Sequence, residues 1–231
     1  MSPSGLKILA YELTPLGILC LRRRKLPSDP GTTVTEVTLD GEFLMSSRNT
    51  ASERALAESA LEMHPGLELK TLVGGLGLGY TASAALASPR VGSLETVELL
   101  PQVIAWLDQR LWPLADELKA DTRFQAVQGD IFKLLAGPPK RRFDLILIDV
   151  DHSPEERLDE ASGSFYTAKG LARAKRHLEP GGILGVWSYS ECIPFGEALR
   201  KTFAEVRIQP VLFQNRLADT VRTDWLYFGR S

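Results

Sequence analysis

The chain has 231 residues, of which 44% are hydrophobic and 24% are charged, so it can bury a sizeable core, and disorder is excluded as its main state. A net charge of −2 gives no general reason to expect nucleic acid or acidic membranes as partners, and two cysteines are too few for a metal cage or a disulfide framework. Because no run of about 18 apolar residues and no secretory signal pattern occur, we expect a soluble, cytoplasmic protein that does not contact membranes.

The first part of the chain is predicted to form a small β-strand module, residues 1–48. Asp40-Gly41 separates two strand-like runs, and this dipeptide is a strong signal for a hairpin. Thr14-Pro15-Leu16-Gly17 separates two earlier runs and predicts another turn, with Pro27–Thr32 as the loop between the two hairpins. The four predicted strands are Leu6–Leu13, Ile18–Leu26, Thr33–Leu39 and Glu42–Met45.

From residue 49 to residue 231 the hydrophobic period alternates between that of helices and that of strands. The predicted helices are Ala51–Met63, Thr81–Ala87, Pro101–Leu118, Ile131–Leu135 and Thr167–Leu178. The predicted strands between them are Leu69–Val73, Leu94–Leu99, Phe124–Val127, Phe143–Ile148 and Ile183–Trp187. Alternation of this length is typical of parallel βαβ units with helices on both faces of the sheet.

The C-terminal part breaks this alternation. A helix over Phe195–Phe203 precedes two strands, Val206–Phe213 and Trp225–Phe228, with no helix between them. Such strands pair as a hairpin and add an antiparallel edge to the parallel sheet. The sequence therefore predicts an α/β fold, a doubly wound, seven-stranded, mostly parallel sheet preceded by the β-strand module.

A glycine-rich loop stands between the first parallel strand and its helix. Gly75, Gly77 and Gly79 lie in this loop, where glycine permits positive φ and close approach of a ligand to the backbone. The spacing also satisfies the dinucleotide pattern G-x-G-x-x-A, which is a weak signal alone. A tight turn that binds nothing is the alternative interpretation.

Acidic residues close the next three strands, at the sheet edge where open α/β folds bind their ligands. Glu98 is placed to accept hydrogen bonds from ribose hydroxyls, and Asp130 from an exocyclic amine, although Asp130 can also cap the following helix. The fourth strand ends in Asp149, with Asp151 and His152 close behind. Several carboxylates would repel a pyrophosphate and attract a sulfonium, which favours S-adenosylmethionine over NAD as the ligand.

These motifs together resemble the spermidine-synthase-like family within the class I S-adenosylmethionine-dependent methyltransferase superfamily, over nearly the whole chain. The similar segments are Leu39-Asp40-Gly41, Val73–Gly79, Val97-Glu98, Gly129-Asp130, Phe143–Asp149 and Leu178–Ile183. The resemblance implies a Rossmann-like domain that binds S-adenosylmethionine or its decarboxylated form, without a metal, and a possible homodimer. The residues that it implies for the donor are Gly75, Gly77, Gly79, Glu98, Leu99, Asp130, Ile131 and Asp149.

The sequence also departs from the family pattern. Leu78 stands where spermidine synthases have an aspartate in the glycine loop, and His152 stands where the second aspartate of their D-S-S-D-P signature is expected. Their tyrosine-glutamine-glutamate, which helps to hold the polyamine, aligns with Glu53-Arg54-Ala55, and an arginine facing the site would have the wrong sign for a diamine.

These departures favour a methyltransferase that acts on a small amine or hydroxyl. The alternatives are an aminopropyltransferase that uses decarboxylated donor and a polyamine, and a non-catalytic nucleoside-binding protein. Asp149 is the candidate base, and Asp151 and His152 could share its work. Tyr166 either lines the acceptor pocket or packs beneath the loop.

Overall fold

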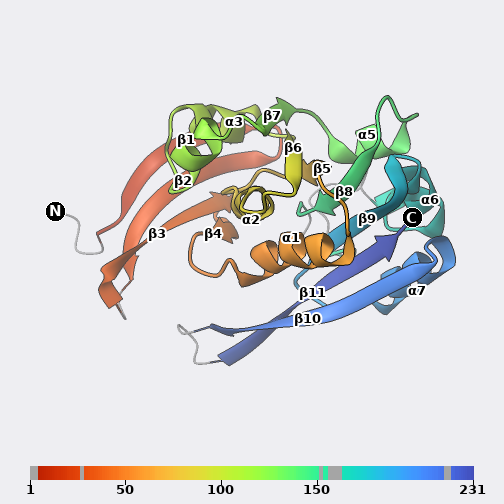
Figure 1. The fold of residues 1–231 in the computed structure, drawn as a ribbon. Coiled ribbons are helices and arrows are strands. Elements are labelled where there is room, and N and C mark those ends of the chain that lie inside the picture. The colour runs from red at the N-terminus through yellow and green to blue at the C-terminus, as the bar shows by residue number, and fades with distance from the viewer. Residues whose placement is uncertain (1–4, 27–28, 151–152, 156–162, 216–219) are drawn as a thin grey trace.

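The structure is a computed structural model, and it describes residues 5–26, 29–150, 153–155, 163–215 and 220–231. Two sheets make up the fold (Figure 1). The first is a four-stranded antiparallel sheet with the order β1-β2-β3-β4, and the second has seven strands in the order β10-β11-β9-β8-β5-β6-β7. This is the predicted α/β architecture.

The first sheet is an antiparallel meander. Its strands are β1 (Lys7–Thr14), β2 (Gly17–Leu26), β3 (Asp29–Leu39) and β4 (Glu42–Ser46). Asp40 and Gly41 both have positive φ, 50° and 84°, which a tight hairpin turn with this dipeptide requires. The predicted loop Pro27–Thr32 is too long, because β3 begins at Asp29 and pairs with the end of β2 through a register shift.

The second sheet contains five parallel strands and an antiparallel edge. Its strands are β5 (Leu69–Gly74), β6 (Val91–Glu98), β7 (Phe124–Gln128), β8 (Phe143–Ile148), β9 (Leu178–Ser188), β10 (Glu205–Asn215) and β11 (Thr220–Arg230). Strand β11 pairs antiparallel with both β9 and β10, as the missing helix between the last two strands predicted. β5 lies between β6 and β8, so its end reaches the switch point of the sheet.

The helices agree with the sequence pattern except at two positions, one of which is the helix predicted over Thr167–Leu178: it ends at Lys175, because Leu178 already begins β9. The helices are α1 (Ala51–Met63), α2 (Tyr80–Leu86), α3 (Pro101–Asp108), α4 (Ala115–Ala120), α5 (Ile131–Ala136), α6 (Ala168–Lys175) and α7 (Ile193–Thr202). The prediction of a single helix over Pro101–Leu118 is wrong, because this segment forms two helices, α3 and α4, with a non-helical stretch between them. Arg110 adopts a left-handed φ of 57°, and Pro113 disfavours helical geometry at the residue before it.

The first sheet packs directly on the larger α/β unit. Buried Leu19 and Leu21 of β2 belong to the same apolar core as Trp106 of α3. Two polar contacts reinforce this packing: the Trp106 indole donates to Glu12 Oε1 at 2.7 Å, and Arg23 donates to the Leu111 carbonyl at 2.8 Å. These contacts fix the first sheet against the second, so residues of the first sheet can line a site at the edge of the second.

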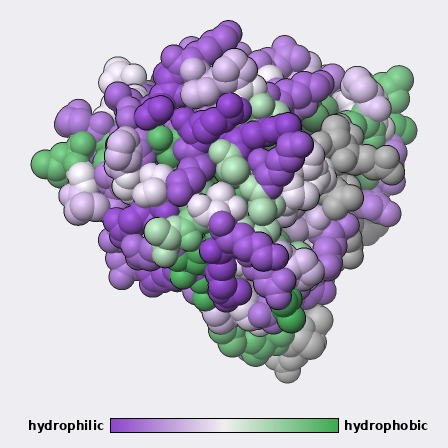
Figure 2. Space-filling view, turned by 90° about the vertical axis from the view of Figure 1, so that its right-hand side faces the viewer, coloured by the Kyte–Doolittle hydropathy of each residue, from purple (hydrophilic) through white to green (hydrophobic). Residues whose placement is uncertain are grey.

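On the side of the molecule where α5, α6 and α7 lie in Figure 1, hydrophilic side chains predominate and apolar ones occur in small groups (Figure 2). Across the part of the chain that the structure describes, none of the helices is long and apolar enough to cross a membrane.

Candidate functional site

The glycine loop joins β5 to α2 with three left-handed glycines. Gly75, Gly77 and Gly79 have φ values of 90°, 52° and 81°, so the predicted positive φ is confirmed at all three. Gly75 also meets a steric requirement, because a Cβ there would stand 2.2 Å from the carbonyl oxygen of Asp149. The loop and the end of β8 can therefore touch only where the side chain is absent.

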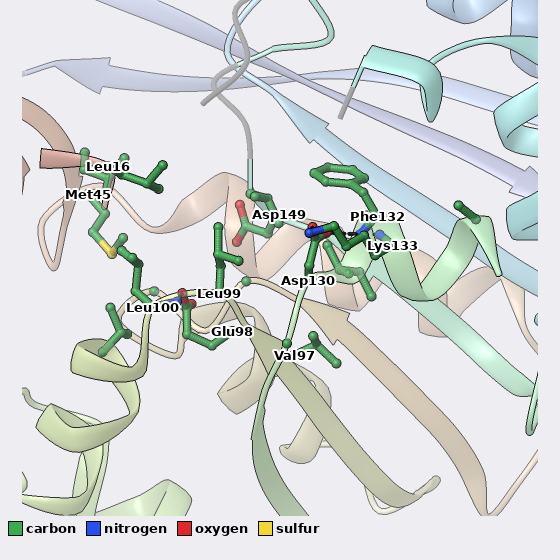
Figure 3. Close-up of a pocket in the computed structure, with 18 of the residues that line it drawn as sticks. Leu16, Met45, Val97, Glu98, Leu99, Leu100, Asp130, Phe132, Lys133 and Asp149 are labelled. Carbon is green, nitrogen blue, oxygen red and sulfur yellow. Dashed lines mark hydrogen bonds and ion pairs between the residues drawn. The ribbon is translucent and has the colours of Figure 1, made fainter. Parts of the chain in front are cut away.

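A cavity of about 180 Å³ opens beside this loop, and we call it the smaller cavity (Figure 3). In Figure 3, Leu16 and Met45 lie on one side of it and Asp130 and Phe132 on the other, with Asp149 between them. Its remaining lining includes Gly75, Gly77, Val97, Glu98, Leu99, Leu100, Val103, Ile131 and Val150. Apolar walls with a few carboxylates suit a flat, polar-edged ligand such as a nucleoside.

Glu98 is fixed in this cavity by the backbone around it. Its Oε2 accepts from the Leu76 amide at 2.9 Å, and its Oε1 accepts from the Leu100 amide, also at 2.9 Å. Burial raises the pKa of Glu98, and these amides oppose the rise. The amides of Gly77 and Leu99 also act on this carboxylate, so Glu98 lines the cavity while it holds the glycine loop in place.

Asp130 has the capping role that the sequence offered as one interpretation. Its Oδ1 accepts from the amides of Phe132 and Lys133, at 2.9 and 3.0 Å, at the start of α5. The side chain also lines the smaller cavity, where its Oδ2 forms an ion pair with Lys133 Nζ at 3.5 Å. The carboxylate can therefore cap the helix and face a ligand at the same time.

A second cavity of about 750 Å³, the larger cavity, adjoins the first. Glu53 of α1, Asp149 after β8 and Asp224 of β11 line it, and we call these three the acidic group. Hydroxyls contact all three: Thr81 Oγ1 donates to Asp149 Oδ2 at 2.7 Å, and Ser52 Oγ lies 2.6 Å from Asp224 Oδ2 and 3.2 Å from Glu53 Oε2.

Crowding of the acidic group perturbs its protonation. Burial and the neighbouring charge of Asp149 raise the pKa of Glu53 to about 8. Burial likewise raises the pKa of Asp149 to about 6, against the opposing hydrogen bond from Thr81. The pKa of Asp224 is also raised by burial, with the Ser52 hydroxyl opposing the rise. The group therefore holds a proton at neutral pH, and a cation that enters the cavity would be attracted to it.

Aromatic side chains complete the wall around the acidic group. Tyr80, Trp187, Tyr189 and Phe213 all line the larger cavity. Aromatic faces and carboxylates together are the chemistry that binds ammonium groups. Arg54, which the sequence left as a possible cation in the site, lines neither cavity; its Cζ lies 5.2 Å from the centroid of the Tyr80 ring.

The two cavities meet at Asp149. This residue and its neighbour Val150 line both, together with Leu44, Met45 and Gly77. A ligand in one cavity and a ligand in the other would therefore approach each other beside the Asp149 carboxylate.

The other predicted site residues are distributed as follows. Gly79 lines the larger cavity rather than the smaller one that holds Gly75 and Gly77. Tyr166 is absent from the lining of both cavities and packs edge-on against Phe165 and Phe195 in an aromatic cluster. Asp151 and His152, the other candidate catalytic residues, lie outside the described residues.

Sequence reasoning missed Glu53 and Asp224. The alignment with the family pattern draws attention to Arg54 rather than to Glu53, and Asp224 precedes the predicted strand Trp225–Phe228 with no motif around it. Ser52 and Asp224 are far apart in the chain, and only the packing of α1 beside β11 brings them into contact. Within the described ranges, no group of three or more His, Cys, Asp or Glu is arranged to hold a metal ion.

No family model matches the sequence, and no curated protein sequence matches it. Solved structures do match. A spermidine synthase in complex with the transition-state analogue AdoDATO superposes with a TM-score of 0.76 at 17% identity, over 97% of this chain and 73% of that one. The fold is that of the spermidine synthases. The spermidine synthase from Thermotoga maritima gives a TM-score of 0.72, also at 17% identity, over 97% and 72% of the two chains.

The spermidine-synthase fold accounts for both sheets, since the match covers nearly all of this chain. At this identity the likeness establishes the fold, and the chemistry has to be argued from the residues of the two cavities. Leu78, the departure in the glycine loop, is buried and lines the larger cavity. Glu53 takes a place on the wall of the same cavity and supplies a carboxylate there.

Proposed function

We propose that this protein is an aminopropyltransferase, which moves the aminopropyl group of decarboxylated S-adenosylmethionine to an amine. The observation that carries the proposal is the position of Asp149, which lines both cavities and belongs to the acidic group. The spermidine-synthase fold supports the same assignment.

The smaller cavity is the proposed donor site. Glu98 would accept hydrogen bonds from the ribose hydroxyls, and Asp130 from the adenine amine. Leu99 and Ile131 line the same cavity and would pack against the adenine and the ribose. Gly75 and Gly77 leave room for the sulfonium end of the donor to reach Asp149.

The larger cavity is the proposed acceptor site. In the reaction, the acceptor nitrogen forms a bond to the terminal carbon of the aminopropyl chain while the bond from that carbon to sulfur breaks. The electron pair remains on sulfur, which yields 5′-methylthioadenosine, and the extra proton on nitrogen passes to a base. Asp149 lines both cavities and would take that proton, since burial raises its pKa to about 6.

The acidic group favours aminopropyl transfer over methyl transfer. A methyl acceptor needs no cation-binding wall, whereas both reactants of aminopropyl transfer carry ammonium groups beside the reacting atoms. Glu53, Asp149 and Asp224, with aromatic faces around them, supply the complementary charge. Arg54 lies over the Tyr80 ring and lines neither cavity, so this arginine does not face the acceptor.

The test is incubation of the purified protein with a panel of amines and, in separate reactions, decarboxylated or intact S-adenosylmethionine. We expect release of 5′-methylthioadenosine and a product heavier by one aminopropyl group, both measured by mass spectrometry. Asp149→Asn should reduce the rate by about 10²–10⁴-fold while leaving methylthioadenosine binding in place. Formation of S-adenosylhomocysteine from the intact donor would instead identify a methyltransferase, and binding without either product would identify a non-catalytic protein.

A further inference from the structure

The larger cavity has a basic wall that the proposed transfer does not use. Arg22 and Arg24 of β2 face this cavity and share the Glu36 carboxylate of β3, at 3.0 and 2.7 Å. Although burial opposes it, the two guanidinium groups lower the pKa of Glu36, so this carboxylate is ionised at neutral pH. One carboxylate beside two arginines leaves this part of the wall with a net positive charge.

Arg48 adds a third guanidinium group to the basic wall. The register of the first sheet sets Ser46 opposite Glu36, and Arg48 follows two residues later and lines the cavity. Its Nη1 is covered from solvent and has no hydrogen-bond partner among the residues that the structure describes. A covered guanidinium N–H without an acceptor is unfavourable, so Arg48 would gain from a shift that brings its guanidinium group to an anionic ligand in the cavity.

Arg222 completes the basic wall from the opposite sheet. It lies two residues before Asp224 on β11 and lines the same cavity, and its charge lowers the pKa of Asp224 against the larger effect of burial. In Figure 1 the far ends of β10 and β11 extend toward the side of the first sheet. The larger cavity thus presents the acidic group and four arginines to a single ligand.

We propose that the larger cavity holds a carboxylate-binding site built on Arg48, so that the acceptor is an amine that also bears a carboxylate, as basic amino acids do. The ammonium end would lie at the acidic group and the carboxylate at the basic wall, where arginine offers two parallel N–H donors. A plain diamine would leave the basic wall without a partner. This assignment of the carboxylate to the acceptor rests on the proposed aminopropyl transfer.

The test compares ornithine with putrescine, because the two molecules differ only by the carboxylate. Each is titrated calorimetrically into the wild-type protein, Arg48→Gln and Arg48→Lys, with Arg142→Gln as a control that changes the net charge equally at an exposed position outside both cavities. We expect ornithine to bind more tightly, and Arg48→Gln to weaken ornithine by about tenfold or more with little effect on putrescine. The affinity of Arg48→Lys for ornithine should lie between those of the wild type and Arg48→Gln, because lysine keeps the positive charge but lacks the two parallel N–H donors of arginine.

A second arm identifies the source of the carboxylate. S-adenosylmethionine and its decarboxylated form are titrated into the same proteins, with thermal unfolding as the check that each variant folds. If Arg48→Gln weakens only the intact donor, the carboxylate site is confirmed and belongs to the donor, and the proposed aminopropyl transfer is wrong. If neither ornithine nor the intact donor responds to Arg48→Gln, the carboxylate site is wrong, whatever the transfer assay gives.

Discussion

Thr81 Oγ1 lies 2.7 Å from Asp149 Oδ2, and this hydrogen bond joins the first turn of α2 to the carboxylate shared by the two cavities. The bond favours the ionised form of Asp149 and opposes the burial that raises its pKa to about 6. A residue that lines neither cavity therefore contributes to the pKa of the proposed base.

Replacement of Thr81 by valine should raise the pKa of Asp149 further. A hydrogen bond to a charged group contributes about 1.5–3 kcal/mol, so the acid limb of the pH–rate profile should move upward by about one pH unit or more. The measurement is the rate of methylthioadenosine release from about pH 5 to pH 9, within the range where these carboxyls titrate. Thr81→Ser keeps the hydroxyl, so the acid limb of its pH–rate profile should stay where it is in the wild type. An equal shift of the limb in both variants would show that the hydrogen bond from residue 81 does not affect the pKa of Asp149.

Glu53 should make the folded protein less stable as the pH rises. Its pKa is raised from 4.5 to about 8 in the folded state, so between these values the folded protein binds a proton that the unfolded chain has released. The free energy of unfolding should then fall with rising pH, by at most about 1.4 kcal/mol per pH unit for one proton. Below pH 4.5 and above pH 8 this contribution should be flat.

The measurement is urea unfolding of the wild type, Glu53→Gln and Glu58→Gln across this pH range. Glu53→Gln removes the titrating group, so its stability should depend less on pH. Glu58 lies on the same helix with an exposed side chain and serves as the matched control. A wild-type curve no steeper than that of Glu53→Gln would show that Glu53 titrates normally.

The sequence predicted both the N-terminal β-strand module and the mostly parallel sheet, because the local signals agree with the fold. Asp40-Gly41 has the positive φ values that a tight hairpin needs, and the alternating periods fix the parallel strands. The interruption between α3 and α4 was not predicted, because the apolar residues of this segment keep a helical spacing although Pro113 interrupts the helical backbone.

The candidate site divides in the same way. Glu98 and Asp130 could be found because each closes a strand, and every parallel strand ends at the same edge. Glu53 and Asp224 could not, because α1 and β11 are brought together only by packing, and neither residue stands at the end of a parallel strand. The charge of the basic wall depends on which face of β2 meets the cavity, and this is a tertiary property.

Gly75 should be more sensitive to substitution than another glycine with similar backbone geometry. Gly75 and Gly181 have φ values of 90° and 78°, but a Cβ at Gly75 would stand 2.2 Å from the Asp149 carbonyl oxygen, whereas a Cβ at Gly181 meets nothing within 4 Å. Gly181→Ala should lower the free energy of unfolding by about 1 kcal/mol, and Gly75→Ala by about 2 kcal/mol more, because a backbone atom has to move. Denaturant unfolding measures both, and equal losses would mean that the loop shifts freely.

Asp130 offers a way to separate the helix cap from the proposed ligand contact. Asp130→Ala removes both and should lose about 1 kcal/mol of stability, whereas Asp130→Ser retains a capping oxygen for the Phe132 and Lys133 amides and should fold with nearly wild-type stability. If the carboxylate also accepts from adenine, both variants should bind methylthioadenosine about 10-fold to 100-fold more weakly in calorimetric titration. Wild-type affinity in Asp130→Ser would reduce Asp130 to a cap and would leave Glu98 as the acidic residue that holds the nucleoside.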